Sequence, residues 1–261
     1  MISRRTIQIP AGHYNIGIES DIAVRLKTQL PPDLKIQWFF NSIPRHSVYV
    51  KNFCISSRLI TVSEFDEFVA GTGYITEAEA DGWGWTWNGC WEKSADVSWR
   101  KPFMGDANLD YLKYSDIFPV LQITWNDANE YCKWRSISGI SCRLPDETEW
   151  EIFASIIGYQ SITDEIIIRD KIRNERSYFD EIIKHLGMYK DGHRPGLVWE
   201  WVNDWFLPYP GGGDNKEYGT VYKILRGGSL ASHEFQRTRE FRFRRCPTAR
   251  SPFYGFRCIV E

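Results

Sequence analysis

The stretch TWNDANEYCKWRSISGISCRLPDETEWEIFA, residues 124–154, predicts two helices separated by a short break. Thr124 is followed three residues later by Asp127, and Asp146 by Glu149, a spacing typical of an N-terminal cap in which side chains accept hydrogen bonds from free amides. Each such cap stabilises a helix by about 1 kcal/mol. Apolar residues at helical spacing follow each cap: Trp125, Ala128 and Cys132 in the first helix, and Trp150, Phe153 and Ala154 in the second.

Outward from this stretch, the pattern predicts a third helix and many short strands. Thr61 with Glu64 forms a capping box, and Gly73 marks the end of that helix. The expected strands cover residues 7–9, 14–18, 47–55, 197–201, 222–225 and 254–260. Residues 81–119 are expected to form a long functional loop, and residues 180–185 a helix. Helices and strands that do not alternate indicate one α+β domain over residues 1–261.

Composition excludes several classes of protein. The 261 residues carry 32 Lys and Arg against 34 Asp and Glu, a net charge of −2 that argues against a nucleic-acid partner. No run approaches the ~18 apolar residues of a membrane span, and residues 1–12 lack the apolar core of a secretory signal, so we expect a cytoplasmic protein without a membrane partner. Six cysteines without a CxxC motif do not make a disulfide scaffold.

Four segments resemble, in order and spacing, the formylglycine-generating enzyme (sulfatase-modifying factor) family. They lie in residues 61–79, 99–151, 196–205 and 225–258, and include Thr72-Gly73-Tyr74, Arg143-Leu144-Pro145, Trp199-Glu200-Trp201, Leu225-Arg226-Gly227-Gly228-Ser229 and Gly255-Phe256-Arg257-Cys258. The resemblance implies a C-type-lectin-like α+β fold with few helices, short twisted strands and long irregular loops. Residues 206–211 also resemble a loop of the ergothioneine-type sulfoxide synthases, which carry a related domain.

The resemblance also implies a copper site that this chain cannot build. Oxidase members hold copper with two cysteines shortly after the Gly-Gly-Ser run, but here the first position falls on Ser232 and the second within residues 234–237. Soft Cu(I) requires thiolates, which a serine hydroxyl does not replace. Ser229 and His233 remain as candidate catalytic residues, an acid–base or nucleophile pair. The alternative is that both are structural residues of a turn.

Metal ligands are fewer than in the related enzymes. The five histidines show no HxxxH or HxH spacing, so iron or copper stays possible without a located site. The family's structural calcium site implies the carbonyls of Gly196 and Val198, the Glu200 carboxylate and, less directly, Asp191 as ligands. The alternative is that Glu200 pairs with a nearby arginine.

An arginine-rich segment suggests the ligand. Residues 226–257 contain eight arginines and two acids, a local charge of +6. Arginine recognises carboxylate and phosphate in a bidentate manner. We therefore predict that Arg239, Arg242 and Arg250 bind an anionic small molecule or peptide above Trp199. The alternative is that such arginines pair internally.

Two functions follow from these patterns. The first is a divergent, metal-dependent oxidative tailoring enzyme that acts on an anionic small molecule or peptide and does not activate sulfatases. The second is a non-catalytic ligand- or protein-binding module with a lectin-like fold. The resemblance further matches Cys132 and Cys258 to positions that pair as a disulfide in secreted relatives. In a cytoplasmic protein we expect adjacent reduced thiols there.

Overall fold

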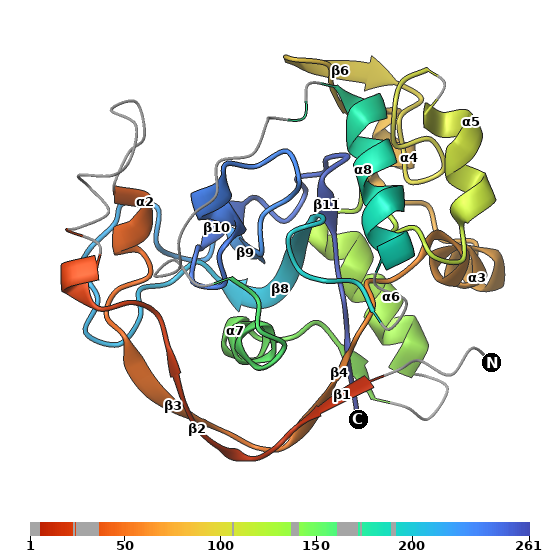
Figure 1. Cartoon of the computed structure of the whole chain (residues 1–261). Coiled ribbons are helices and arrows are strands. Elements are labelled where there is room, and N and C mark those ends of the chain that lie inside the picture. Colours follow the sequence, from red (N-terminus) through yellow and green to blue (C-terminus); the bar gives the residue numbers. More distant parts are fainter. Residues whose placement is uncertain are drawn as a thin grey trace.

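Small twisted sheets surrounded by helices make up the chain, which is shown as a computed structural model in Figure 1. The structure describes residues 6–22, 24, 37–105, 107–136, 141–160, 172, 174–188 and 192–261. No helix among these residues is long and apolar enough to cross a membrane. The arrangement confirms the predicted α+β class.

Two four-stranded sheets form the framework. The first has the order β1-β4-β12-β7, with β1 Thr6–Ile9, β4 Phe53–Ser56, β12 Ile259–Val260 and β7 Cys142–Arg143. The second has the order β10-β9-β8-β11, with β10 Phe243–Arg245, β9 Lys223–Arg226, β8 Trp199–Trp205 and β11 Tyr254–Gly255. In the first sheet Ile259 pairs with both Ile55 and Arg143, so the last strand joins the start of the chain to its middle.

Two hairpins extend from this framework. The strands β2 Gly12–Ile16 and β3 His46–Val50 pair antiparallel and continue β1 and β4 as one long ribbon in Figure 1. The strands β5 Trp83–Trp87 and β6 Trp91–Ala95 also pair antiparallel. The predicted strand over residues 7–9 is confirmed, the one over 14–18 lies two residues earlier as β2, and the one over 47–55 is divided into β3 and β4.

The predicted helices form, three of them with their predicted starts, whereas the helix expected over residues 180–185 begins five residues earlier, at Glu175, and ends three residues later, at Met188. They are α3 Val62–Thr72, α6 Trp125–Ser136, α7 Glu147–Ile156 and α8 Glu175–Met188, with the shorter α2 Gln37–Phe40, α4 Glu77–Asp81, α5 Ala107–Tyr111, η1 Leu112–Tyr114 and η2 Glu234–Arg237. Thr61 and Asp146 each form a capping box with the residue three positions on. Thr124 Oγ1 accepts from the Asp127 amide at 3.1 Å, which confirms the start of α6.

Residues 81–119 differ from the expected loop because they contain the β5–β6 hairpin. Trp83, Trp85 and Trp87 alternate with smaller residues, and Gly89 supplies the positive φ of 84° that its turn requires. Gly84 lies so close to Val97 that a Cβ there would be 2.6 Å from the valine Cγ1. The hairpin therefore depends on glycine at two positions.

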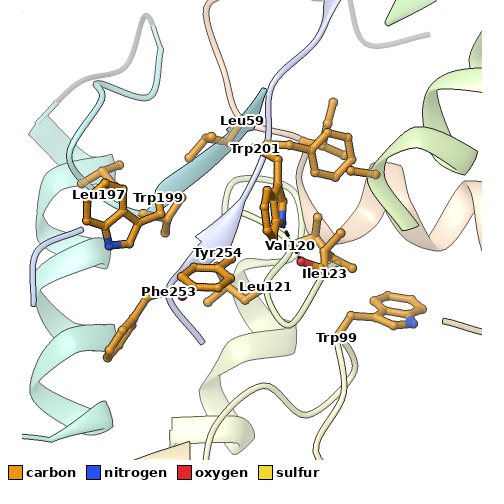
Figure 2. Close-up of a cluster of buried hydrophobic side chains, with 14 of the residues drawn as sticks. Leu59, Trp99, Val120, Leu121, Ile123, Leu197, Trp199, Trp201, Phe253 and Tyr254 are labelled. Carbon is orange, nitrogen blue, oxygen red and sulfur yellow. Dashed lines mark hydrogen bonds between the residues drawn. The ribbon is translucent and has the colours of Figure 1, made fainter. Parts of the chain in front are cut away.

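Tryptophans hold the core between the sheets and the helices. Figure 2 shows Trp199, Trp201 and Trp99 among buried aliphatic side chains. The Trp201 indole donates to the Ile123 carbonyl at 2.9 Å, so its polar atom is satisfied inside the core. This packing fixes β8, and with it the turn that follows β9.

Candidate functional site

The candidate site covers residues 227–237, which comprise the turn after β9 and the short helix η2. Gly227 and Gly228 have φ values of 88° and 71°. A Cβ on Gly227 would lie 2.9 Å from Trp150 Cζ2, and one on Gly228 2.7 Å from the Gln236 carbonyl oxygen. Both the backbone conformation and the close approach therefore require glycine.

Two serine hydroxyls close this turn. The Oγ atoms of Ser229 and Ser232 lie 3.0 Å apart, and the Ser229 amide donates to Ser232 Oγ at 3.0 Å. The Ser232 amide in turn donates to the Ser229 carbonyl at 2.9 Å. Ser229 is 1% exposed, so its hydroxyl is engaged inside the turn. The hydroxyl of Ser232 stands where the resemblance puts the first copper cysteine.

His233 begins the short helix η2. Its amide donates to Gln236 Oε1 at 3.1 Å in a capping-box arrangement, and its ring stacks on Phe235 with centroids 5.5 Å apart. These contacts match the turn-forming alternative for Ser229 and His233. The two predicted catalytic residues share one turn, and the described contact of the Ser229 hydroxyl is to Ser232.

Arg237 is a site residue that the sequence-based prediction missed. Its side chain is 13% exposed, and Nη1 contacts Glu234 Oε1 at 3.3 Å. Among the described residues, its buried Nε–H has no hydrogen-bond acceptor. Burial raises the pKa of Tyr159, and the adjacent Arg237 guanidinium opposes that shift. Arg237 lies at the end of residues 234–237, the stretch of the second copper cysteine, and that coincidence was the available signal.

Arg242, a predicted ligand-binding residue, is engaged inside the protein, which matches the internal-pairing alternative. Arg242 is 2% exposed, and its Nε and Nη2 donate to the two carboxylate oxygens of Glu147 at 2.6 and 2.8 Å. Its Nη1 donates to the Asn41 carbonyl at 2.6 Å, and Nη2 also donates to the Leu207 carbonyl at 2.9 Å. Each of the three guanidinium nitrogens thus donates to the protein, and the side chain joins α7 to two loops.

The other predicted ligand-binding residues also serve the fold. Arg250 is 3% exposed, donates to Asp81 and the Trp83 carbonyl, and lies 3.8 Å above the Trp83 ring. Arg239, with a side chain 29% exposed, pairs with Glu240 at 3.0 Å. Trp199 is 4% exposed and stacks on Phe243 with centroids 4.7 Å apart. Trp199 is therefore a core residue.

Glu200 faces an arginine. Both of its oxygens accept from Arg257, at 2.5 and 2.8 Å, and one also accepts from the Trp150 indole at 2.8 Å. Glu200 is 0% exposed, so a cation would have to displace a buried guanidinium. This arrangement does not fit a calcium ligand and matches the ion-pair alternative. Gly196 and Val198 are buried beside it, whereas Asp191 lies outside the described residues.

Three cysteines meet away from this turn. The Sγ atoms of Cys132 and Cys258 lie 3.5 Å apart as reduced thiols, which confirms that these residues are adjacent. The Cys142 thiol joins them, and burial raises the pKa of Cys258 well above its ordinary value. Within the described part of the chain, this trio is the one group of three His, Cys, Asp or Glu side chains close enough to share a metal ion. None of the turn residues belongs to this trio.

The fold and this turn define a C-type-lectin-like α+β domain. The family profile of the sulfatase-modifying factor enzyme 1-like domain matches residues 3–180 and 185–261, so the chain belongs to the formylglycine-generating enzyme family. It is 28% identical to the formylglycine-generating enzyme of Streptomyces coelicolor, over 84% of this chain and 81% of that protein.

Further relatives include one protein named as an enzyme and one named as inactive. Identity to the formylglycine-generating enzyme of Mus musculus is 24%, over 98% of this chain and 75% of that protein. Identity to the inactive C-alpha-formylglycine-generating enzyme 2 of Bos taurus is 30%, over 57% of this chain and 48% of that protein. Among solved structures, PvdO from Pseudomonas aeruginosa has a TM-score of 0.60 at 20% identity and covers 98% of this chain and 94% of its own.

Proposed function

We propose that this chain is a ligand-binding member of the formylglycine-generating enzyme family that does not oxidise sulfatase cysteines. The observation that carries the proposal is the hydroxyl pair of Ser229 and Ser232 in the turn where oxidase members hold copper. A hydroxyl has a far higher pKa than a thiol and is a poor ligand for Cu(I). The turn keeps its glycine-dependent shape without the thiolates that the oxidation requires.

The ligand that this turn suits best is an anionic small molecule or a peptide carboxylate. Arg237 offers a buried Nε–H that lacks an acceptor among the described residues, and a buried donor without an acceptor costs about 1–3 kcal/mol. A carboxylate or phosphate oxygen would satisfy that donor in a charge-assisted hydrogen bond. The guanidinium already contacts Glu234, so the ligand would share or displace that contact.

A thermal-shift series tests this binding. Citrate, pyrophosphate and a short peptide with a free C-terminus are the probes, on the wild type, Arg237→Lys and Arg245→Lys. Arg245 belongs to the same arginine-rich segment, but it is exposed and lies over Phe243. We expect at least one probe to stabilise the wild type and Arg245→Lys but not Arg237→Lys; at 100 times its Kd a ligand stabilises by about 2.7 kcal/mol. Equal shifts in all three proteins, or none in the wild type, would contradict the proposal.

Oxidative tailoring of an anionic small molecule or peptide is the second candidate function. Relatives that match most of this chain are named as enzymes, which favours it. Metal analysis of the purified protein separates the two: stoichiometric iron or copper that is lost on changing Ser229 or His233 supports catalysis at the turn. Protein that lacks such metal yet shows the Arg237-dependent binding supports the binding function.

A further inference from the structure

Three buried thiols come together from separate parts of the chain. Cys132 lies on α6, Cys142 on β7, and Cys258 immediately before β12. All three Sγ atoms lie within 4.8 Å of one another, and those of Cys132 and Cys258 are 3.5 Å apart. None of the three belongs to the turn at Ser229, so the cluster is separate from the proposed ligand site.

The spacing of the thiols suits a single small ion. With one Sγ–Sγ distance of 3.5 Å and the other two no longer than 4.8 Å, a point exists at most about 2.6 Å from each sulfur. Metal–thiolate bonds are about 2.3 Å long, so small χ1 adjustments would bring all three sulfurs to bonding distance.

The backbone around the cluster fixes its shape. Ser136 Oγ lies 2.9 Å from the carbonyl oxygens of both Cys132 and Cys142, and it accepts from the Cys142 amide at 3.0 Å. Val260 pairs with Cys142 in the sheet, which holds β12 against β7. Helix, edge strand and C-terminal strand are therefore tied together next to the sulfurs, so little ordering would be needed on binding.

The chemistry of the set selects the metal. Zn²⁺ in structural sites takes four ligands, and the described residues supply three here. Hard cations prefer oxygen, whereas thiolates select Cu(I). We propose that Cys132, Cys142 and Cys258 form a three-coordinate site for a soft monovalent ion, Cu(I). The ion enters past Cys142, because this residue lies on the edge strand β7 and is 6% exposed.

Competition against a chromogenic Cu(I) chelator, under anaerobic reducing conditions, tests the site. The experiment uses the full chain with the substitutions Cys54→Ser, Cys90→Ser and Cys246→Ser, which leave the buried trio as its only cysteines. We expect one Cu(I) per chain and a raised melting temperature. The further change Cys142→Ala removes a direct ligand and should weaken binding by more than the roughly 10–100-fold that loss of an outer-shell partner causes.

Circular dichroism establishes that each variant is folded. If Cys142→Ala does not fold, Cys142→Ser replaces it in the binding measurement. Three results would overturn the site: no Cu(I) bound by the Cys54/Cys90/Cys246 background, equal affinity after removal of the Cys142 thiol, or retention of Zn²⁺ in preference to Cu(I). Because Ser229, Ser232 and Arg237 take no part, these results are independent of the ligand-binding proposal.

Discussion

Replacing Arg242 with Ala distinguishes a structural arginine from a ligand-binding one. The change removes four hydrogen bonds, two to the Glu147 carboxylate and one each to the carbonyls of Asn41 and Leu207. Glu147 would then share its only remaining partner in this network, Arg226, with Glu151. Breaking a buried ion pair on one side costs about 3–5 kcal/mol, a large part of the about 5–15 kcal/mol that stabilises a typical domain.

Urea unfolding of the wild type, Arg242→Ala and Arg176→Ala measures that cost. Arg176 is the matched control because it also contacts two carboxylates, Asp110 and Asp180, but its side chain is 48% exposed. Exposed pairs contribute about 0–1 kcal/mol, so Arg176→Ala should change the free energy of unfolding little. If Arg242→Ala were no more destabilising than Arg176→Ala, the assignment of Arg242 to the fold would be refuted.

Three further perturbations probe other buried polar groups. Burial, with Glu147 nearby, raises the pKa of Asp204 to about 6, so protonation of this acid stabilises the folded state and that stabilisation is lost as pH rises through 6. In unfolding experiments the free energy of unfolding of Asp204→Asn should therefore rise by about 1–3 kcal/mol relative to that of the wild type between pH 4 and 7. A difference between the two proteins that does not change with pH would refute the pKa shift. Burial and the Arg257 charge lower the pKa of His193 to about 3, so stability should fall as pH drops below 6.5, and an NMR titration midpoint above 5 would contradict this. Glu175 accepts from the amides of Trp87 and Met104, and Glu175→Ala should cost about 1–3 kcal/mol and speed hydrogen exchange at Trp87; unchanged exchange there would argue against the contact.

Local signals made the helices predictable. A cap acts between a residue and the amide three positions on, so Thr61 with Glu64 and Asp146 with Glu149 can be identified in the sequence alone. The β5–β6 hairpin carried a comparable signal in the alternation of its tryptophans and in Asn88-Gly89, a turn dipeptide. The high content of Gly and Trp in this segment concealed the alternation of large and small side chains that is typical of a strand.

Long-range pairing explains why most of the arginine prediction failed. Arg242 meets Glu147 at a separation of 95 residues, and Arg257 meets Glu200 at 57. Composition shows an excess of arginine in residues 226–257 but cannot show which acids elsewhere in the chain neutralise it. Only the three-dimensional arrangement separates Arg242, whose three guanidinium nitrogens all donate to the protein, from Arg237, which retains a buried donor.

The most direct test of the central claim is oxidation of a cysteine peptide. The chain is incubated with a sulfatase-motif peptide, Cu(I) and oxygen, next to the Streptomyces coelicolor relative as a positive control, and aldehyde formation is followed by mass spectrometry. With Ser229 and Ser232 in the turn in place of a thiolate pair, we predict aldehyde no faster than in a copper-only reaction. Aldehyde formed by this chain above that background would contradict the account.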